Sequence, residues 1–382
     1  MALNSEDMLA RASLILLFCL PMFGLPMGCG SSEQVFAGEL TAPVVYGSDD
    51  RVEVSNHPDA DLRRIAQESI VALIPTSRIF SQPDGTYALL AESLQDQHGL
   101  CTGELFGNQP TAATCSGVLI DDDLVLTAGH CVGSRMPCDE YAYVFNYHLD
   151  DPTHLGVIRD EDVYSCDRVV SEGMPLGSDY TPDFAVIKLD RPVEGAHAPV
   201  SVRPATPLDE QESLAMIGFG SGLPAKIDTG GAVADPRPDQ QDYFVANVDA
   251  FQGHSGSATF DSKNRLAGIL IGGRTPDYVT LEGESCQRVA AHPDSPADEV
   301  IHNIAPIVGA LCDVGWDAEA LCSPKACEGQ PCGSVLPPSG GGGIVPADTS
   351  GCSASTGSTG FRSSCLGLLL FAAARRFRRR AV

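Results

Sequence analysis

The chain has 382 residues, enough for one two-lobed domain with targeting segments or for two small domains, and ample for a hydrophobic core. Its formal net charge is −26, and the arginines near the end lie in residues 361–382, a stretch without acids. Such an acidic body argues against nucleic acid as a partner. The terminal arginines directly follow an apolar run, so they do not indicate a nucleic-acid-binding tail.

Residues 1–29 have the pattern of an export signal, with a charged start at Met8–Arg11 and an apolar stretch at Ala12–Leu25. The sequence Gly28-Cys29-Gly30-Ser31 resembles the cleavage box of bacterial lipoproteins. This resemblance implies lipidation of Cys29. Ordinary signal cleavage nearby is the alternative. We expect residues 30–43 to form a short pro-segment or tether before the globular part.

The globular part, residues 44–317, contains short segments rich in Val and Ile between Gly, Pro and Asp, a pattern typical of an all-β barrel or sandwich. Helical spacing of apolar residues is confined to Asp59–Ile65 and Ala297–Leu311. The predicted strands are Ser69–Ile74, Cys115–Ile120, Leu124–Thr127, Tyr141–Asn146, Phe184–Leu189, Leu214–Gly218, Tyr243–Val248, Ala258–Phe260 and Ala267–Ile271.

The chain has 14 cysteines, an even set that, behind an export signal, indicates disulfides in an oxidising compartment. Zinc is the alternative, but Cys322, Cys327 and Cys332 do not have the spacing of about two to four residues found in zinc knuckles. Proximity along the chain suggests the pairs Cys138–Cys166 and Cys312–Cys322. Residues 318–332 form a Cys-rich appendix to which the sequence assigns no role.

Residues 333–360 are rich in Gly, Ser, Pro and Thr and are predicted to be a flexible linker. In residues 361–382, an apolar run shorter than the ~20 residues of a stable membrane span precedes the arginines. With Gly351-Cys352, this end is similar to the C-terminal sorting tags of myxobacterial surface proteins. The resemblance implies an exported protein, extracellular or anchored at the cell surface, with membrane contact through the N-terminal signal and the C-terminal tail.

Hydrolysis of a peptide bond by serine needs a base, an acid that orients the base, and donors for the oxyanion. His130 follows a predicted strand in the motif LTAGHC, and Cys131 lies 16 residues after Cys115. The pattern CSGVLI…VLTAGHC resembles the histidine loop of trypsin-like serine peptidases. The resemblance implies that His130 is the general base and that Cys115 and Cys131 form a disulfide.

Ser255 lies in the motif GHSGS, where flanking glycines permit a sharp turn that exposes the hydroxyl group. The N–H groups of Gly253 and Ser255 can then form an oxyanion hole. Asp183 begins the motif DFAVIKL, which resembles the element that carries the family's catalytic acid, and Asp179 is the alternative. The chain order His, Asp, Ser is also that of this superfamily.

The resemblance covers about residues 44–312 and implies two six-stranded antiparallel β-barrels, as in chymotrypsin, with a C-terminal helix. It implies a serine endopeptidase that hydrolyses protein or peptide substrates through His130, Asp183, Ser255 and an acyl-enzyme, without a cofactor or metal. A catalytically inactive surface binding module of the same fold, or an esterase, is the alternative. The oligomeric state stays open.

Further details resemble the bacterial glutamyl endopeptidases. Val44–Arg51, which reads VVYGSDDR, is similar to the start of their mature domains. The nucleophile motif is GHSGS, with His254 where trypsin has an aspartate that pairs with a new N-terminal amine. Because a buried charge needs a partner, that activation pair is not expected here.

Four residues are candidates for the substrate pocket. Gly272 and Gly273 end a segment that resembles the strand lining the substrate cleft, and Leu270 stands where glutamate-specific relatives have a histidine. Asp249 lies six residues before Ser255, the offset of the acid in the trypsin pocket, where a carboxylate favours Arg or Lys at P1, the residue before the cleaved bond. Leu270 weakens the case for glutamate, and the P1 preference stays open.

Overall fold

The computed structural model describes residues 44–133, 136–151, 154–174, 181–291, 296–316 and 319–322, all within one compact unit of the chain. Several predicted parts lie outside the described residues: the signal with Cys29, the pro-segment, the linker with Cys352 and the C-terminal segment. Asp179 lies outside them as well. The expectations for those parts therefore stay predictions.

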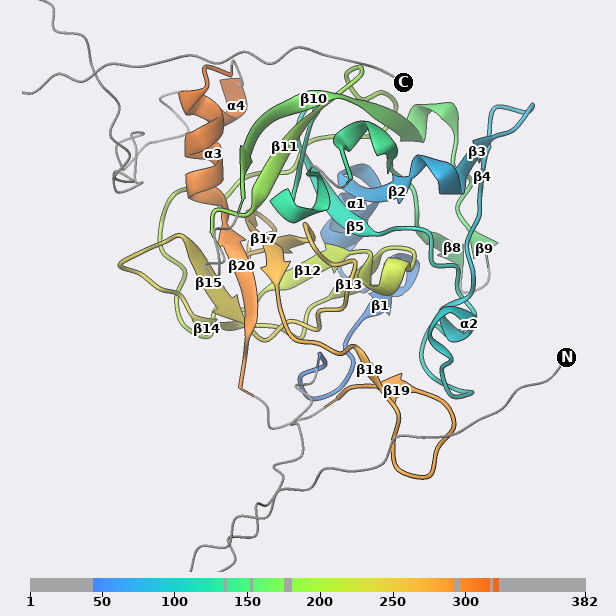
Figure 1. The fold of residues 1–382 in the computed structure, drawn as a ribbon. Coiled ribbons are helices and arrows are strands. Elements are labelled where there is room, and N and C mark those ends of the chain that lie inside the picture. Colours follow the sequence, from blue (N-terminus) through green and yellow to red (C-terminus); the bar gives the residue numbers. More distant parts are fainter. Residues whose placement is uncertain are drawn as a thin grey trace, which may run out of the picture. The chain divides into compact units, whose positions relative to one another are not determined.

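The first half of the domain is a closed antiparallel barrel of six strands, adjacent in the order β10-β11-β6-β5-β2-β7 (Figure 1). Its strands are β2 (Ile70–Pro75), β5 (Cys115–Asp121), β6 (Leu124–Thr127), β7 (Tyr141–Val144), β10 (Val163–Gly173) and β11 (Phe184–Leu189). Most of them are runs of buried apolar residues that fill the barrel. Strand β10 has two irregularities in its pairing with β11, and pairs of polar residues interrupt its apolar residues without a regular alternation, which explains why the pattern of apolar runs did not predict it.

The second half is an eight-stranded antiparallel sheet, where the sequence led us to expect a second six-stranded barrel. In spatial order its strands are β1 (Val52–Glu53), β13 (Lys226–Asp228), β12 (Ala215–Gly218), β16 (Ala258–Phe260), β17 (Leu266–Gly272), β20 (Glu299–Asn303), β15 (Tyr243–Ala246) and β14 (Val233–Asp235). The extra strands at the two ends are only two or three residues long, too short to give a sequence signal.

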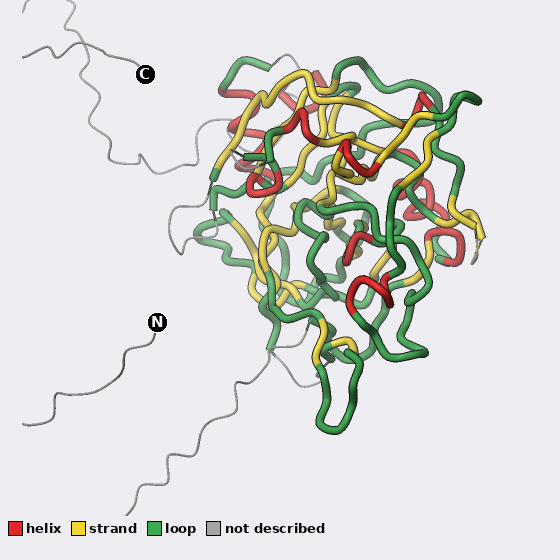
Figure 2. Tube along the Cα trace, turned by 45° about the vertical axis from the view of Figure 1, so that its right-hand side comes forward, coloured by secondary structure: helices red, strands yellow, loops and turns green. Residues whose placement is uncertain are grey.

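The remaining elements are short, as Figure 2 shows by the small share of helix among strands and loops. They are β3 (Ile79–Ser81), β4 (Tyr87–Leu89), β8 (Leu149–Asp151), β9 (His154–Leu155), β18 (Tyr278–Val279), β19 (Arg288–Val289), α1 (Ala60–Glu68), α2 (Leu94–His98), α3 (Ile304–Asp313) and α4 (Glu319–Cys322). Within the described ranges, no helix has both the length and the apolar character needed to cross a membrane.

The C-terminal helix is present as α3, but it begins at Ile304 and not at Ala297. The preceding residues form β20, which is hydrogen-bonded between β17 and β15, because the β-branched pair Val300 and Ile301 packs well in a sheet. The side chain of Asn303 accepts a hydrogen bond from the N–H of Ala305 and so starts the helix. The all-β class with a closed barrel and a C-terminal helix is thus confirmed.

Four disulfides link the eight cysteines within the described ranges. Cys115 is bonded to Cys131, and the two pairs suggested by proximity along the chain, Cys138–Cys166 and Cys312–Cys322, are bonded as well. Cys101–Cys286 joins residues 185 positions apart, and the sequence held no signal for that pairing.

Candidate active site

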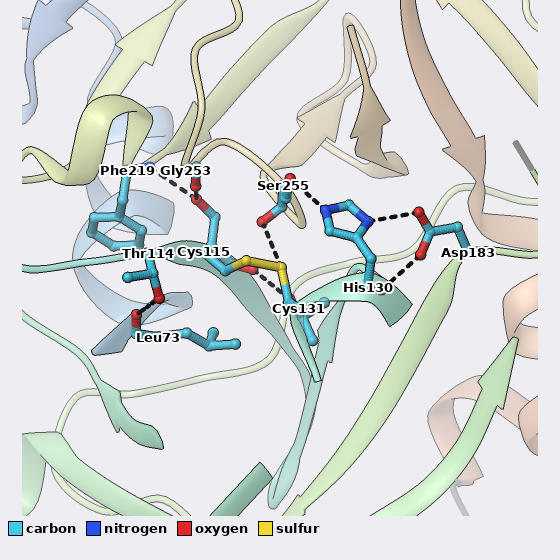
Figure 3. The surroundings of a disulfide bond; sticks show 11 residues. Leu73, Thr114, Cys115, His130, Cys131, Asp183, Phe219, Gly253 and Ser255 are labelled. Carbon is cyan, nitrogen blue, oxygen red and sulfur yellow. Dashed lines mark hydrogen bonds and ion pairs between the residues drawn. A yellow bond between two sulfur atoms is a disulfide. The ribbon is translucent and has the colours of Figure 1, made fainter. Parts of the chain in front are cut away.

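His130 and Asp183 lie together because two neighbouring strands of the barrel bring them there. Strand β6 ends just before the histidine and β11 begins just after the aspartate, and the antiparallel register pairs Thr127 with Ala185. The His130 N–H donates to Asp183 Oδ1 at 2.9 Å, and His130 Nδ1 lies 2.7 Å from Asp183 Oδ2 (Figure 3). Asp183 is buried, whereas the imidazole keeps one edge open.

Ser255 comes from the other half of the domain, in the turn between β15 and β16. Its Oγ lies 2.7 Å from His130 Nε2, so the imidazole contacts the serine on one side and the carboxylate on the other (Figure 3). The N–H of Ser116, on β5, donates to the Ser255 carbonyl at 2.8 Å. Since Cys115 is bonded to Cys131, the start of β5 holds both the histidine loop and the serine turn.

Two backbone N–H groups beside Ser255 are oriented by the peptide groups that contain them. The Gln252 carbonyl accepts from the N–H of Ser221 at 2.6 Å, and the His254 carbonyl accepts from the N–H of Ser257 at 2.7 Å. In a trans peptide the N–H points opposite to the C=O, so the N–H groups of Gly253 and Ser255 point away from these bonds. Within the described part of the chain neither N–H donates to a protein acceptor.

The sequence did not single out Ser116, yet its side chain fixes this turn. The hydroxyl group donates to the Gly253 carbonyl at 2.8 Å and accepts from the Phe219 N–H at 3.0 Å, with no exposure to solvent. It therefore ties the nucleophile turn to the loop after β12. The motif CSGVLI contains this serine, but a serine within a predicted strand gives no sign of such long-range contacts.

Gly129 has no room for a side chain beside His130. A Cβ atom there would lie 2.4 Å from the Gly173 carbonyl oxygen and 3.0 Å from Asp183 Oδ1. We expect Gly129→Ala to displace the imidazole from the carboxylate and to lower kcat by about 10²-fold, as misplacement of a reacting group by about 1 Å can do.

The measurement is kcat on a peptide substrate together with the melting temperature. Gly133→Ala is the matched control in the same loop, because a Cβ atom there meets nothing within 4 Å. Unchanged kcat in Gly129→Ala would contradict the steric argument.

His254 is a buried, neutral histidine. Its Nδ1 accepts from the Phe251 N–H at 3.0 Å, and its ring packs so closely under Gly220 that a Cβ there would lie 2.4 Å from the ring. Burial, with the charges of Arg51 and Lys226, lowers the pKa of His254 to about 3. A neutral imidazole offers no charge to an N-terminal amine, which agrees with the expectation from the GHSGS motif.

Asp249 has partners that differ from those expected of a pocket acid. Its carboxylate oxygens accept from the N–H groups of Tyr46 at 2.9 Å and Asp50 at 3.1 Å. Burial and the nearby carboxylate of Asp228 raise the pKa of Asp249. Both oxygens thus bind the N-terminal segment, so Asp249 holds residues 46–50 in place, and its expected role as a pocket acid stays a prediction.

The other three pocket candidates lie at the end of β17. Leu270 packs in a cluster with Phe244 and other buried apolar side chains, so it contributes its backbone and not a pocket wall. The Leu270 carbonyl accepts from the Gly256 N–H at 2.7 Å, which holds β17 beside the nucleophile turn. Gly272 is half-buried and Gly273 is exposed, so the open part of this strand begins there.

Residues 115–269, which include all three residues of the predicted triad, match the family described as trypsin-like peptidase domain. A curated relative, the snake venom serine protease catroxase-1 of Crotalus atrox, is 30% identical over 175 residues, 44% of this chain. That match spans 58% of the relative, less than two thirds of its length.

Among solved structures, a Glu endopeptidase in complex with MPD has a TM-score of 0.37 at 20% identity and covers 60% of this chain and 88% of its own. Kallikrein-related peptidase 10 has a TM-score of 0.35 at 20% identity, and the match covers 53% of this chain and 90% of the kallikrein chain. These matches show that residues 115–269 are similar to a trypsin-like peptidase domain, and this segment spans strands of both the barrel and the eight-stranded sheet.

Proposed function

We propose that the protein is a serine endopeptidase that cleaves peptide bonds through His130, Asp183 and Ser255. The observation that carries this proposal is the position of the His130 imidazole, 2.7 Å from Ser255 Oγ and 2.7 Å from Asp183 Oδ2. A nucleophile and a base at this distance, with the base oriented by a third group, are the requirements of covalent acyl transfer.

In the proposed mechanism, His130 Nε2 takes the proton of Ser255 as the hydroxyl oxygen attacks the substrate carbonyl. Asp183 holds Nδ1 protonated and stabilises the imidazolium that forms. The N–H groups of Gly253 and Ser255 donate to the oxyanion. His130 then protonates the leaving amine, and water hydrolyses the acyl-enzyme by the same route in reverse.

The proposal extends to an exported enzyme, secreted or anchored at the cell surface, acting on protein or peptide substrates. The disulfides in the described residues support an oxidising compartment. The relation to the bacterial glutamyl endopeptidases rests on Val44–Arg51 and on the GHSGS turn. It concerns the scaffold and not a preference for glutamate, because Leu270 is part of the core.

A fluorophosphonate probe, which reacts with an activated serine, tests the proposal directly. We expect the full-length exported protein to be labelled at Ser255, and Ser255→Ala and His130→Ala to lose the label. Ser201→Ala, at an exposed serine away from the site, controls for nonspecific reaction and keeps the label. A folded, disulfide-bonded wild-type protein that stays unlabelled would favour the inactive binding module instead.

A further inference from the structure

Ser221, in the loop after β12, has a backbone conformation that is costly for a residue with a side chain. Its φ is 55° and its ψ is 19°, and the residue is buried. This left-handed region favours glycine, because a Cβ atom there crowds the following carbonyl oxygen. A serine that keeps this conformation between Gly220 and Gly222 points to a role for its side chain and its backbone.

The side chain of Ser221 is bonded to Tyr278. The two hydroxyl groups share a hydrogen bond at 2.6 Å, and both residues are buried. The ring of Tyr278 packs against His98 and Phe251, with ring centroids 4.6 Å and 6.0 Å away. The tyrosine hydroxyl group is therefore a fixed partner, and its bond stabilises the left-handed conformation of the serine.

The backbone of the same serine binds the nucleophile turn. The Ser221 N–H donates to the Gln252 carbonyl at 2.6 Å, and the Gln252 N–H donates to Asp277 Oδ2 at 2.8 Å. Asp277 directly precedes Tyr278 in the chain. One short segment therefore holds the loop at Ser221 and also the residue that precedes Gly253.

Gln252 and Gly253 share the peptide group whose N–H is the first proposed oxyanion donor. Gly253 has a φ of +97°, and a Cβ atom there would lie 2.7 Å from the Phe219 carbonyl oxygen, so the position requires glycine. Glycine takes positive and negative φ with similar ease, which leaves the peptide group free to rotate. The bond from the Ser221 N–H then decides which way the Gly253 N–H points.

We infer that Ser221 and Tyr278 are positioning residues for the oxyanion hole. The inference rests on the proposed peptidase activity. The bond between the two hydroxyl groups keeps Ser221 left-handed, and this conformation aims its N–H at the Gln252 carbonyl. The peptide group is thereby held with the Gly253 N–H on the opposite side, toward the substrate oxyanion.

The first test is Tyr278→Phe, which removes one hydroxyl group and keeps the ring. We expect kcat on a peptide substrate to fall by about 10-fold to 10²-fold, with KM within about twofold of the wild type. The fall stays below the loss of about 10²-fold to 10³-fold that follows removal of a donor, because the Gly253 N–H is still present. A fall in kcat without a change in KM is the sign of an interaction made only in the transition state.

The control for Tyr278→Phe is Tyr164→Phe, which removes a buried hydroxyl group from strand β10. The Tyr164 hydroxyl oxygen accepts from the Glu194 N–H at 2.9 Å. Its loss should lower the melting temperature and leave kcat unchanged.

Substitutions of Ser221 separate its conformation from its hydroxyl group. Ser221→Ala loses the bond to Tyr278 and keeps the cost of the left-handed backbone, so kcat should fall at least as far as in Tyr278→Phe. Ser221→Gly loses the same bond but takes this conformation freely, so it should recover part of the lost kcat. The double variant should lose no more than Ser221→Ala, since both substitutions break one bond.

A strained residue elsewhere in the domain controls for general destabilisation. Asn264 has a φ of 58° in the turn between β16 and β17. Alanine tolerates this conformation poorly, so Asn264→Ala should lower the melting temperature. Its kcat should equal that of the wild type.

A pair of inhibitors tests the oxyanion hole without turnover. Ser255 Oγ adds to the carbonyl carbon of a peptide aldehyde and its proton passes to His130, so the adduct places an oxyanion in the hole. The matching peptide alcohol has the same side chains and forms no adduct. We expect Tyr278→Phe to weaken binding of the aldehyde by about 10-fold or more and binding of the alcohol by less than about twofold. A merely structural role would weaken both alike.

The outcomes distinguish this inference from the proposed function. A wild type that fluorophosphonate does not label would mean that the peptidase proposal fails, and this inference with it. A labelled wild type whose kcat is unchanged in Tyr278→Phe, or a Ser221→Gly variant slower than Ser221→Ala, would overturn the positioning role alone. If Ser221→Ala does not fold, Tyr278→Phe and the inhibitor pair decide between the two results.

Discussion

Replacement of Ser255 by alanine is expected to lower kcat by about 10⁶-fold, the loss seen when a serine peptidase is deprived of its nucleophile. The hydroxyl group contacts His130 Nε2 at 2.7 Å, and no other described residue offers a nucleophile at that position. The rate is measured on a peptide substrate with a fluorogenic leaving group at constant pH.

The control for Ser255→Ala is a measurement of its melting temperature. Ser255 is half-buried and its carbonyl, which the substitution retains, makes the bond to Ser116. The melting temperature should therefore stay within a few degrees of the wild type. A residual rate within tenfold of the wild type would show that another group attacks the substrate.

Replacement of Asp183 by asparagine is expected to lower kcat by about 10⁴-fold. The carboxylate accepts from the His130 backbone N–H and faces Nδ1, so it keeps the proton on Nδ1 and leaves Nε2 free to take the serine proton. An amide nitrogen at this position would donate to Nδ1 and place the proton on Nε2, where it blocks the transfer.

Asp190→Asn is the matched control for Asp183→Asn, at the other end of the same strand, where the carboxylate pairs with Arg191 at the surface. We expect it to change kcat less than twofold. A loss of activity in Asp179→Asn that exceeds the loss in Asp183→Asn would assign the acid to Asp179, the alternative from the sequence.

The histidine loop could be predicted because its evidence is local. The strand, the turn and His130 lie within a few residues, and the resemblance of this motif to a known histidine loop implied the bond between Cys115 and Cys131, which is present. The same holds for most barrel strands, whose apolar runs fill a closed interior. Strand β10 was not predicted because bulges and polar residues at the surface interrupt its apolar pattern.

The contacts of the pocket candidates could not be predicted because their partners lie far away in the sequence. Asp249 has the offset of a pocket acid, but the N-terminal segment some 200 residues away binds both its oxygens. Strand β20, which is hydrogen-bonded to β17, lies where the sequence indicated helix. Ser116 likewise acts through contacts more than 100 residues away.

The Cys101–Cys286 disulfide decides what happens to the protein when one copy cleaves another. Lys263 is exposed in the turn between β16 and β17, and exposed turns are preferred sites of proteolytic cleavage. Among the disulfides of the described ranges, Cys101–Cys286 alone bridges that position. A molecule cut there therefore stays in one covalent piece, migrates as a single band until a reductant is added, and keeps β17 and β20 joined to the fragment that carries His130, Asp183 and Ser255.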